Sequence, residues 1–236
     1  METGSYFLPV ILLTGIFLSV KAKKLTLPAA LTAALLGIFL YFGAGYYGII
    51  MAAVLFLMAA LATSQKIAVK EALGAAEKNK GQRNAGQVFA NAGFAGLMGL
   101  LCFFYPLKVD LLRLMMAAGL ASAAADTIAS ELGTVYGKRF YNIISFKPDQ
   151  KGLDGVISLE GTLFGLAASI VIATVYSFSF GWNINFWLII AAGTVGNLSD
   201  SILGATLERK GFLKNNAVNF LNTLIAGLVV FLLSIL

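Results

Sequence analysis

The sequence contains no histidine and only one cysteine. Without histidine, the chain cannot form a His-based catalytic dyad, bind haem through imidazole or build the usual zinc sites. Cys102 stands alone in an apolar run, which excludes a disulfide framework and a cysteine metal motif. Carboxylates, amides and hydroxyls remain for chemistry, and these are the ligands suited to magnesium.

Charged residues are also scarce. They make up 12% of the 236 residues, whereas 59% are hydrophobic, and the mean hydropathy is +0.86. This composition indicates an integral membrane protein, because a soluble domain of this size does not need so much apolar sequence. Backbone groups in lipid must bond within their own segment, which favours helices. We therefore expect an all-α, polytopic transmembrane helical bundle that forms a single domain over residues 1–236.

Apolar segments near the roughly 20 residues that a membrane span requires recur along the chain. They cover residues 5–20, 25–43, 46–63, 87–105, 111–133, 158–179, 184–206 and 217–235, so we expect about eight helices. Residues 1–63 read as anchoring helices, and residues 64–236 as the catalytic helices and loops.

The basic residues set the expected orientation. Of the 17 lysines and arginines, all but Lys108 and Arg113 fall in or beside the loops after the first, third, fifth and seventh segments. Basic loops stay in the cytoplasm, so we expect a multi-pass protein of the cell membrane with both termini outside. The same placement argues against nucleic acid as the partner of the net charge of +6, since the basic residues do not line one soluble face.

Acidic side chains occur inside apolar helix sequence. Ser122, Asp126 and Ser130 follow one another at four-residue steps, Glu131 comes next, and Asp200 lies in the seventh segment. Ionisable groups within a membrane are costly and usually mark a functional site. We interpret Asp126, Glu131 and Asp200 as catalytic residues that hold Mg²⁺.

Basic and glycine residues follow these carboxylates and suit phosphate. The loops after the third and fifth segments supply the candidate phosphate-binding residues Arg83, Lys138, Lys147, Lys151 and Gly152. Loop N–H groups and ammonium groups bind anions. The run from Gly133 to Arg139 is not a Walker motif, because its glycine spacing is too short and Arg139 replaces the Ser or Thr that would bind magnesium. A solvated basic stretch facing lipid headgroups is the alternative for the loop after residue 64.

Amide side chains enter two of the predicted helices. Arg83, Gln87 and Asn91 are spaced for one helix face, and Asn216 and Asn219 open the last segment. Hydrogen bonding between helices explains such residues equally well, and Glu160 in a first helical turn also suits the helix dipole. We assign Asn216 to nucleotide or phosphate binding, and the candidate substrate-binding residues are Asn84, Gln87, Asn91, Ser130, Glu160 and Asn219.

Taken together, these motifs resemble the phytyl-phosphate kinase family of the vitamin E pathway. The matching blocks extend from residue 83 to residue 219 and are Arg83-Asn84-x-x-Gln87-Val-Phe-x-Asn91-x-Gly93, Ala125-Asp126-Thr127-x-Ala-Ser130-Glu131-Leu-Gly133, Asp154-Gly155-Val-x-Ser158-x-x-Gly161-Thr162, Asp200-Ser201-x-Leu-Gly204-Ala-Thr206-Leu207 and Asn215-Asn216-x-x-Asn219. The chain is more distantly similar to dolichol kinases and CDP-diacylglycerol synthases. The resemblance implies a CTP-dependent transfer of a phosphoryl group to a prenyl monophosphate.

We therefore expect a prenyl-phosphate kinase whose site faces the cytoplasm. Its partners would be a phytyl, geranylgeranyl or farnesyl monophosphate, a nucleotide triphosphate with Mg²⁺, and membrane lipids; homo-oligomerisation is left open. Two alternatives remain at this point. Intramembrane carboxylates and glycine-interrupted helices also mark ion-coupled secondary transporters or lipid carriers, and a nucleotidyl transfer would instead make a CDP-lipid.

Overall fold

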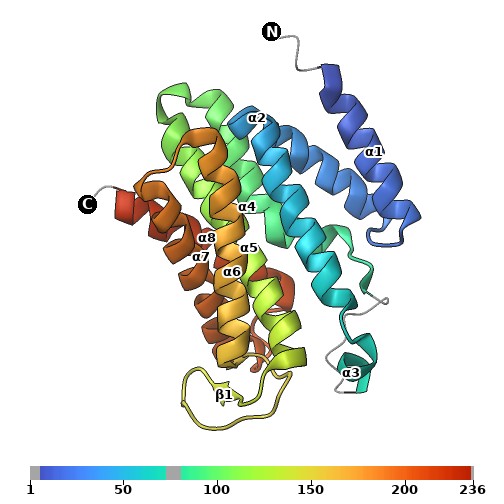
Figure 1. The fold of residues 1–236 in the computed structure, drawn as a ribbon, viewed down its shortest axis with the longest axis vertical. Helices are drawn as coiled ribbons and strands as arrows, with labels where there is room; N and C mark the ends of the chain where they lie inside the picture. The colour runs from blue at the N-terminus through green and yellow to red at the C-terminus, as the bar shows by residue number, and fades with distance from the viewer. Residues whose placement is uncertain (1–5, 73–80, 235–236) are drawn as a thin grey trace.

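The structure, a computed structural model, describes residues 6–72 and 81–234 and confirms an all-α bundle (Figure 1). The elements in chain order are α1 (Phe7–Lys21), α2 (Leu27–Ser64), α3 (Ile67–Ala72), α4 (Ala85–Phe104), the 3-10 turn η3 (Pro106–Lys108), α5 (Val109–Tyr136), β1 (Tyr141–Asn142), β2 (Val156–Ile157), α6 (Leu159–Phe180), α7 (Ile184–Leu203), the π-helical turn η4 (Gly204–Glu208) and α8 (Asn215–Ser234).

Within the described residues, six helices are long and apolar enough to cross a membrane: α2, α4, α5 with η3, α6, α7 with η4, and α8. The first predicted segment forms α1, which has 15 residues and is shorter than a span normally requires. The predicted second and third segments together form α2. This helix breaks at Ala44 and Gly45, where Gly45 has φ 57°, and its two halves run in different directions from that point (Figure 1). The orientation of the termini stays a prediction.

The central element is α5, which contacts α2, α4, α6, α7 and α8. Its middle is almost entirely small and buried, with Ala117, Ala118, Ala121 and Ser122 inaccessible to solvent. Apolar side chains gain little by moving from lipid to protein, so helices in a membrane associate through close packing and polar contacts between small residues. An alanine-rich α5 lets its neighbours approach from several sides, and this brings polar side chains of different helices together.

A long loop joins α5 to α6 at the lower end of the bundle (Figure 1). It contains a short antiparallel pair in which Tyr141 faces Ile157 and Asn142 faces Val156. Gly155 has φ +72°, and a Cβ atom there would lie 2.5 Å from the backbone nitrogen of Ala205 in η4. Arg209 holds the same loop: its Nε donates to the Asp154 carbonyl at 2.5 Å, and its guanidinium pairs with Asp149 at 2.9 Å. The loop is thereby fixed against the end of α7.

Candidate functional site

A cavity of about 740 Å³ lies at this end of the bundle, between α4, α5, α7, α8 and the α5–α6 loop. Many of the predicted site residues line it: Arg83, Asn84, Gln87, Asn91, Asp126, Ser130, Glu131, Gly152, Asp200, Asn216 and Asn219. The predicted residues Lys138 and Glu160 line a second cavity instead. Segments that are distant in sequence therefore converge on one polar space.

Asp126 and Asp200 form the centre of the main cavity. Their carboxyl groups, one from α5 and one from α7, lie close enough for a hydrogen bond between them. The Nδ2 group of Asn222, on α8, donates to Asp200 Oδ1 at 2.8 Å. Ser122 in turn donates to Asn222 Oδ1 at 3.0 Å, and both of these residues are inaccessible to solvent. Three helices thus orient the Asp200 carboxylate through a buried chain of polar contacts.

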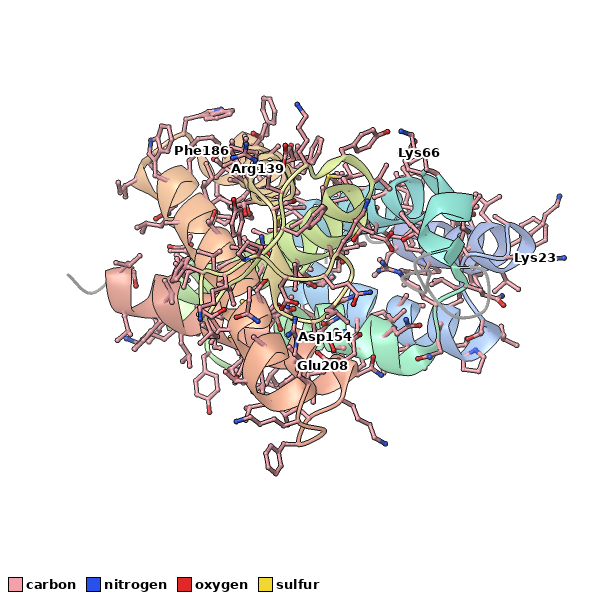
Figure 2. All side chains as sticks on the ribbon, turned by 90° about the horizontal axis from the view of Figure 1, so that it is seen from below. Lys23, Lys66, Arg139, Asp154, Phe186 and Glu208 are labelled. Atoms are coloured by element: carbon pink, nitrogen blue, oxygen red, sulfur yellow. The ribbon has the colours of Figure 1, made fainter. Side chains whose placement is uncertain are left out.

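Further charged groups surround this pair. Arg83 and Glu208 lie near enough to Asp126 to act on it electrostatically, and Asp154 acts on both Asp200 and Glu208. Figure 2 shows Asp154 and Glu208 beside each other when the bundle is viewed from below. Sequence reasoning did not assign Asp154 or Glu208 to the site. The signals were present, since Asp154 lies in one of the matched motifs and Glu208 ends the π-helical turn, an irregularity that often marks functional sites.

Glu131 has protein partners of its own. Thr63 donates to Oε1 at 2.9 Å, and the Lys70 ammonium donates to Oε2. Lys70 also donates to the carbonyls of Ala62 and Thr63 at 2.7 and 3.2 Å, so it satisfies the C-terminal end of α2. The sequence did not indicate a role for Lys70. This lysine lies in a basic stretch for which solvation near lipid headgroups was the alternative interpretation, yet only 1% of the Lys70 surface is exposed. The metal-binding role of Glu131 stays a prediction.

The amide residues have several distinct contacts. Asn84 caps α4, and its side chain and that of Gln87 form a reciprocal capping box. Asn219 Nδ2 donates to Asn91 Oδ1 at 3.4 Å, while the buried Asn219 Oδ1 has no partner among the described protein groups.

The expected common helix face of Arg83, Gln87 and Asn91 is wrong for Arg83. This residue lies before α4, and its backbone pairs with that of Lys24 and Thr26. Arg83 nevertheless reaches the cavity.

The basic residues of the α5–α6 loop are spread over its surface. Lys147 is exposed, and Lys151 lies over the Phe140 ring, 5.4 Å from its centroid. Lys138 reaches the second cavity described above. Asp149 in the same loop accepts from the backbone N–H of Gln150 and from Arg209, and these bonds lower the pKa of its carboxyl group. The main cavity takes its cations from Arg83, Lys70 and Lys214 rather than from these loop lysines.

The ligand chemistry at Asp126 and Asp200 fits Mg²⁺. In residues 6–72 and 81–234, three or more His, Cys, Asp or Glu side chains do not gather in a group that could hold a metal ion alone. Mg²⁺ does not require such a group, because it is commonly held by one or two carboxylates together with substrate phosphates and water. Asp126 and Asp200 supply two carboxylates beside a space lined by amides.

Comparisons with known proteins agree with the motifs. The model of the family described as "Integral membrane protein DUF92" matches residues 10–227. The chain is 33% identical over 210 residues to "Protein VTE6, chloroplastic" of Arabidopsis thaliana, covering 84% of this chain but 62% of that protein. It is 34% identical over 233 residues to an uncharacterized membrane protein of Synechocystis, covering 94% of this chain and 89% of that protein.

A third relative, an uncharacterized membrane protein of Methanocaldococcus jannaschii, is 28% identical over 225 residues and covers 94% of this chain and 92% of its own. No solved structure matches the chain. The family match and the Synechocystis relative both extend over most of the sequence, including every segment that lines the main cavity. The chain therefore belongs to the family of integral membrane proteins known as DUF92.

Proposed function

We propose that this protein is a membrane-embedded phosphotransferase that uses CTP to convert a prenyl monophosphate into the diphosphate. The observation that carries the proposal is the meeting of Asp126 and Asp200 in a polar cavity at one end of an otherwise apolar bundle. The motif resemblance to phytyl-phosphate kinases supports a prenyl phosphate as the acceptor.

Phosphoryl transfer requires in-line positioning and charge neutralisation rather than covalent chemistry by the protein. Asp126 and Asp200 would hold Mg²⁺, which supplies positive charge against the triphosphate oxygens. Arg83, whose side chain is buried at the cavity wall, would bind phosphate oxygens. Asn91, Asn216 and Asn219 also line the cavity, and their N–H groups would orient the nucleotide.

The acceptor needs no general base, because a monophosphate is already an anion at neutral pH. One of its oxygens attacks the γ-phosphorus, the bond from that phosphorus to the β–γ bridging oxygen breaks, and CDP leaves with the bonding electrons. The product is the prenyl diphosphate. Asn222 would keep Asp200 in one orientation during this exchange, since its Nδ2 group donates to Asp200 Oδ1.

The test is to incubate the purified protein in lipid nanodiscs with Mg²⁺, CTP and farnesyl, geranylgeranyl or phytyl monophosphate. Formation of CDP and the prenyl diphosphate is expected, whereas pyrophosphate and a CDP-lipid would mean nucleotidyl transfer instead. ATP, GTP and UTP in parallel reactions measure the nucleotide preference. Absence of every product with all nucleotides and all three lipids would reject the proposal.

A further inference from the structure

A second cavity, of about 590 Å³, opens next to the main one. It lies where α5 has just ended and α6 begins, and its lining includes Lys138, Arg139, Leu159 and Glu160. Its size lies within the usual range for small-molecule sites. Figure 2 shows Arg139 well away from Asp154 and Glu208, which lie by the main cavity.

The two cavities share a wall. Ser158 and Thr162 line both of them, and Ile157 does so as well. Ser158 is the N-cap of α6, and its Oγ accepts the Gly161 N–H at 3.1 Å, so this wall is fixed by the start of the helix. A ligand held in the second cavity therefore lies beside residues that a ligand in the main cavity also contacts.

The chemistry of the second cavity differs from that of the first. Two exposed cations, Lys138 and Arg139, stand beside apolar groups from Ile157, Leu159 and Tyr141. Glu160 also lines this cavity, and its Oε2 accepts the backbone N–H of Lys138 at 3.4 Å, so the carboxylate has a protein donor of its own. Cations next to apolar surface suit an amphiphile with a phosphate at one end. The main cavity also has cations, but it combines them with paired carboxylates and amides.

The position suits a ligand that arrives from the bilayer. Lys138 lies two residues beyond the end of the α5 span, and Leu159 is the first residue of α6. Leu159 is 72% exposed and Leu163, one turn further along α6, is 54% exposed, so apolar surface continues from the cavity along the helix. A lipid lying in the leaflet can place its chain against α6 and its phosphate near the two cations without leaving the membrane.

We propose that the second cavity binds the phosphate end of the acceptor lipid, while the main cavity binds the nucleotide triphosphate. This inference rests on the proposed function and assigns each substrate its own entrance. Lys138 and Arg139 then bind the lipid phosphate rather than the nucleotide, and Ser158 and Thr162 form the boundary at which the two phosphates meet. The division keeps the apolar chain out of the polar cavity.

Steady-state kinetics of the double variant Lys138→Gln/Arg139→Gln test the assignment. We expect KM for farnesyl monophosphate to rise about tenfold or more, because charge-assisted hydrogen bonds to phosphate are lost. KM for CTP should change by less than about twofold. Lys210→Gln, an exposed lysine of the α7–α8 loop that lines neither cavity, is the matched control and should change neither constant. A rise in KM for CTP alone, or no change in either constant, would overturn the assignment.

A direct binding measurement tests the lipid site independently of the proposed reaction. Native mass spectrometry of the wild-type protein, without nucleotide, should detect farnesyl monophosphate, and the double variant should lose that adduct while keeping its elution volume and melting profile. This result would uphold the lipid site even if no nucleotide supported transfer. Equal binding of phosphatidylglycerol would instead mean a general anionic-lipid site, and binding of inorganic phosphate as tight as that of the lipid would mean that the apolar surface contributes nothing. Either result would reject an acceptor-specific site.

Discussion

The carboxyl groups of Asp126 on α5 and Asp200 on α7 lie against each other, although 73 intervening residues separate them in the sequence. Two carboxylates in contact repel each other unless a proton or a cation lies between them. The Asn222 amide steadies Asp200 but brings only partial positive charge. The arrangement is therefore suited to receive a cation, and the space around it is large enough for the phosphates that would share that cation.

Removing either charge of this pair should greatly slow transfer. For Asp126→Asn and Asp200→Asn we expect kcat to fall about 100-fold or more, since electrostatic groups that act on a transition state commonly contribute this much. Asp110→Asn is the control on the same helix, because Asp110 has an exposed side chain in the first turn of α5. It should keep full activity. Rates measured across a magnesium titration would also show a higher magnesium requirement for any residual activity; unchanged rates in both variants would remove the proposed centre.

Breaking the Lys70–Glu131 pair should destabilise the protein more than removing both charges. Their side chains are 2% and 11% exposed, so Lys70→Met leaves a carboxylate buried beside Thr63 without its cation. Loss of one partner from a buried pair typically costs about 3–5 kcal/mol. Unfolding in detergent should show this loss for Lys70→Met and a partial recovery for Lys70→Met/Glu131→Gln. If the double variant were less stable than Lys70→Met, the pair would not act as a unit.

Alanine substitutions at two glycines with the same backbone conformation distinguish the cost of backbone strain from the cost of a steric clash. Gly155 and Gly211 have φ +72° and +75°, but only at Gly155 would a Cβ atom meet neighbouring atoms, those of Ala205. Gly211→Ala should cost about 1–2 kcal/mol from backbone strain alone. Gly155→Ala should cost more and should also lower kcat, because it pushes the α5–α6 loop and Asp154 away from Asp200. Thermal unfolding and kinetics of both variants provide the comparison, and equal effects would contradict a close loop contact.

Acidification should release the same loop from the end of α7. Hydrogen bonds from the Gln150 N–H and Arg209 hold the pKa of the Asp149 carboxyl below its ordinary value. Because the folded-state pKa is lower than the unfolded-state pKa of about 3.9, the ionised carboxylate stabilises the attached loop at any pH above about 3.9. This contribution is lost as the pH falls through the folded-state pKa.

Limited proteolysis of the loop at decreasing pH measures this release. Cleavage should increase below about pH 4 in the wild-type protein. Asp149→Asn, which keeps the size of the side chain but cannot titrate, should be cleaved more readily than the wild type at neutral pH and should show little further change on acidification. A wild-type cleavage rate that does not rise as the pH falls below the unfolded-state pKa of about 3.9 would contradict the role of the Asp149–Arg209 pair.

Much of the site was predictable because costly residues in apolar sequence are conspicuous. Asp126 and Asp200 are charged residues within long, mainly apolar segments, and the structure brings their carboxyl groups together. Lys70 was not predictable in the same way. A lysine in a short polar segment usually stays in water, and only the fold of α3 against the end of α2 places its ammonium next to Glu131.

The residues of the α5–α6 loop show a second limit of prediction from the sequence. Glycines and lysines between residues 137 and 155 indicated a phosphate-binding loop, but a pattern of residue types does not specify the direction of each side chain. The structure instead pins the loop through Arg209 and directs Lys138 towards a separate cavity. The close packing of Gly155 on η4 places Asp154 near enough to Asp200 to act on it electrostatically.

By itself, the sequence determined that the chain is a helical membrane protein, since long apolar segments must satisfy their backbone hydrogen bonds internally, and it singled out the carboxylates that oppose that environment. Only the tertiary structure decided which of these groups meet. The partners of Asp200, Glu131 and Lys138 come from other helices or from residues far along the chain. Such contacts depend on how closely small residues let α5 approach its neighbours, and no local pattern contains that information.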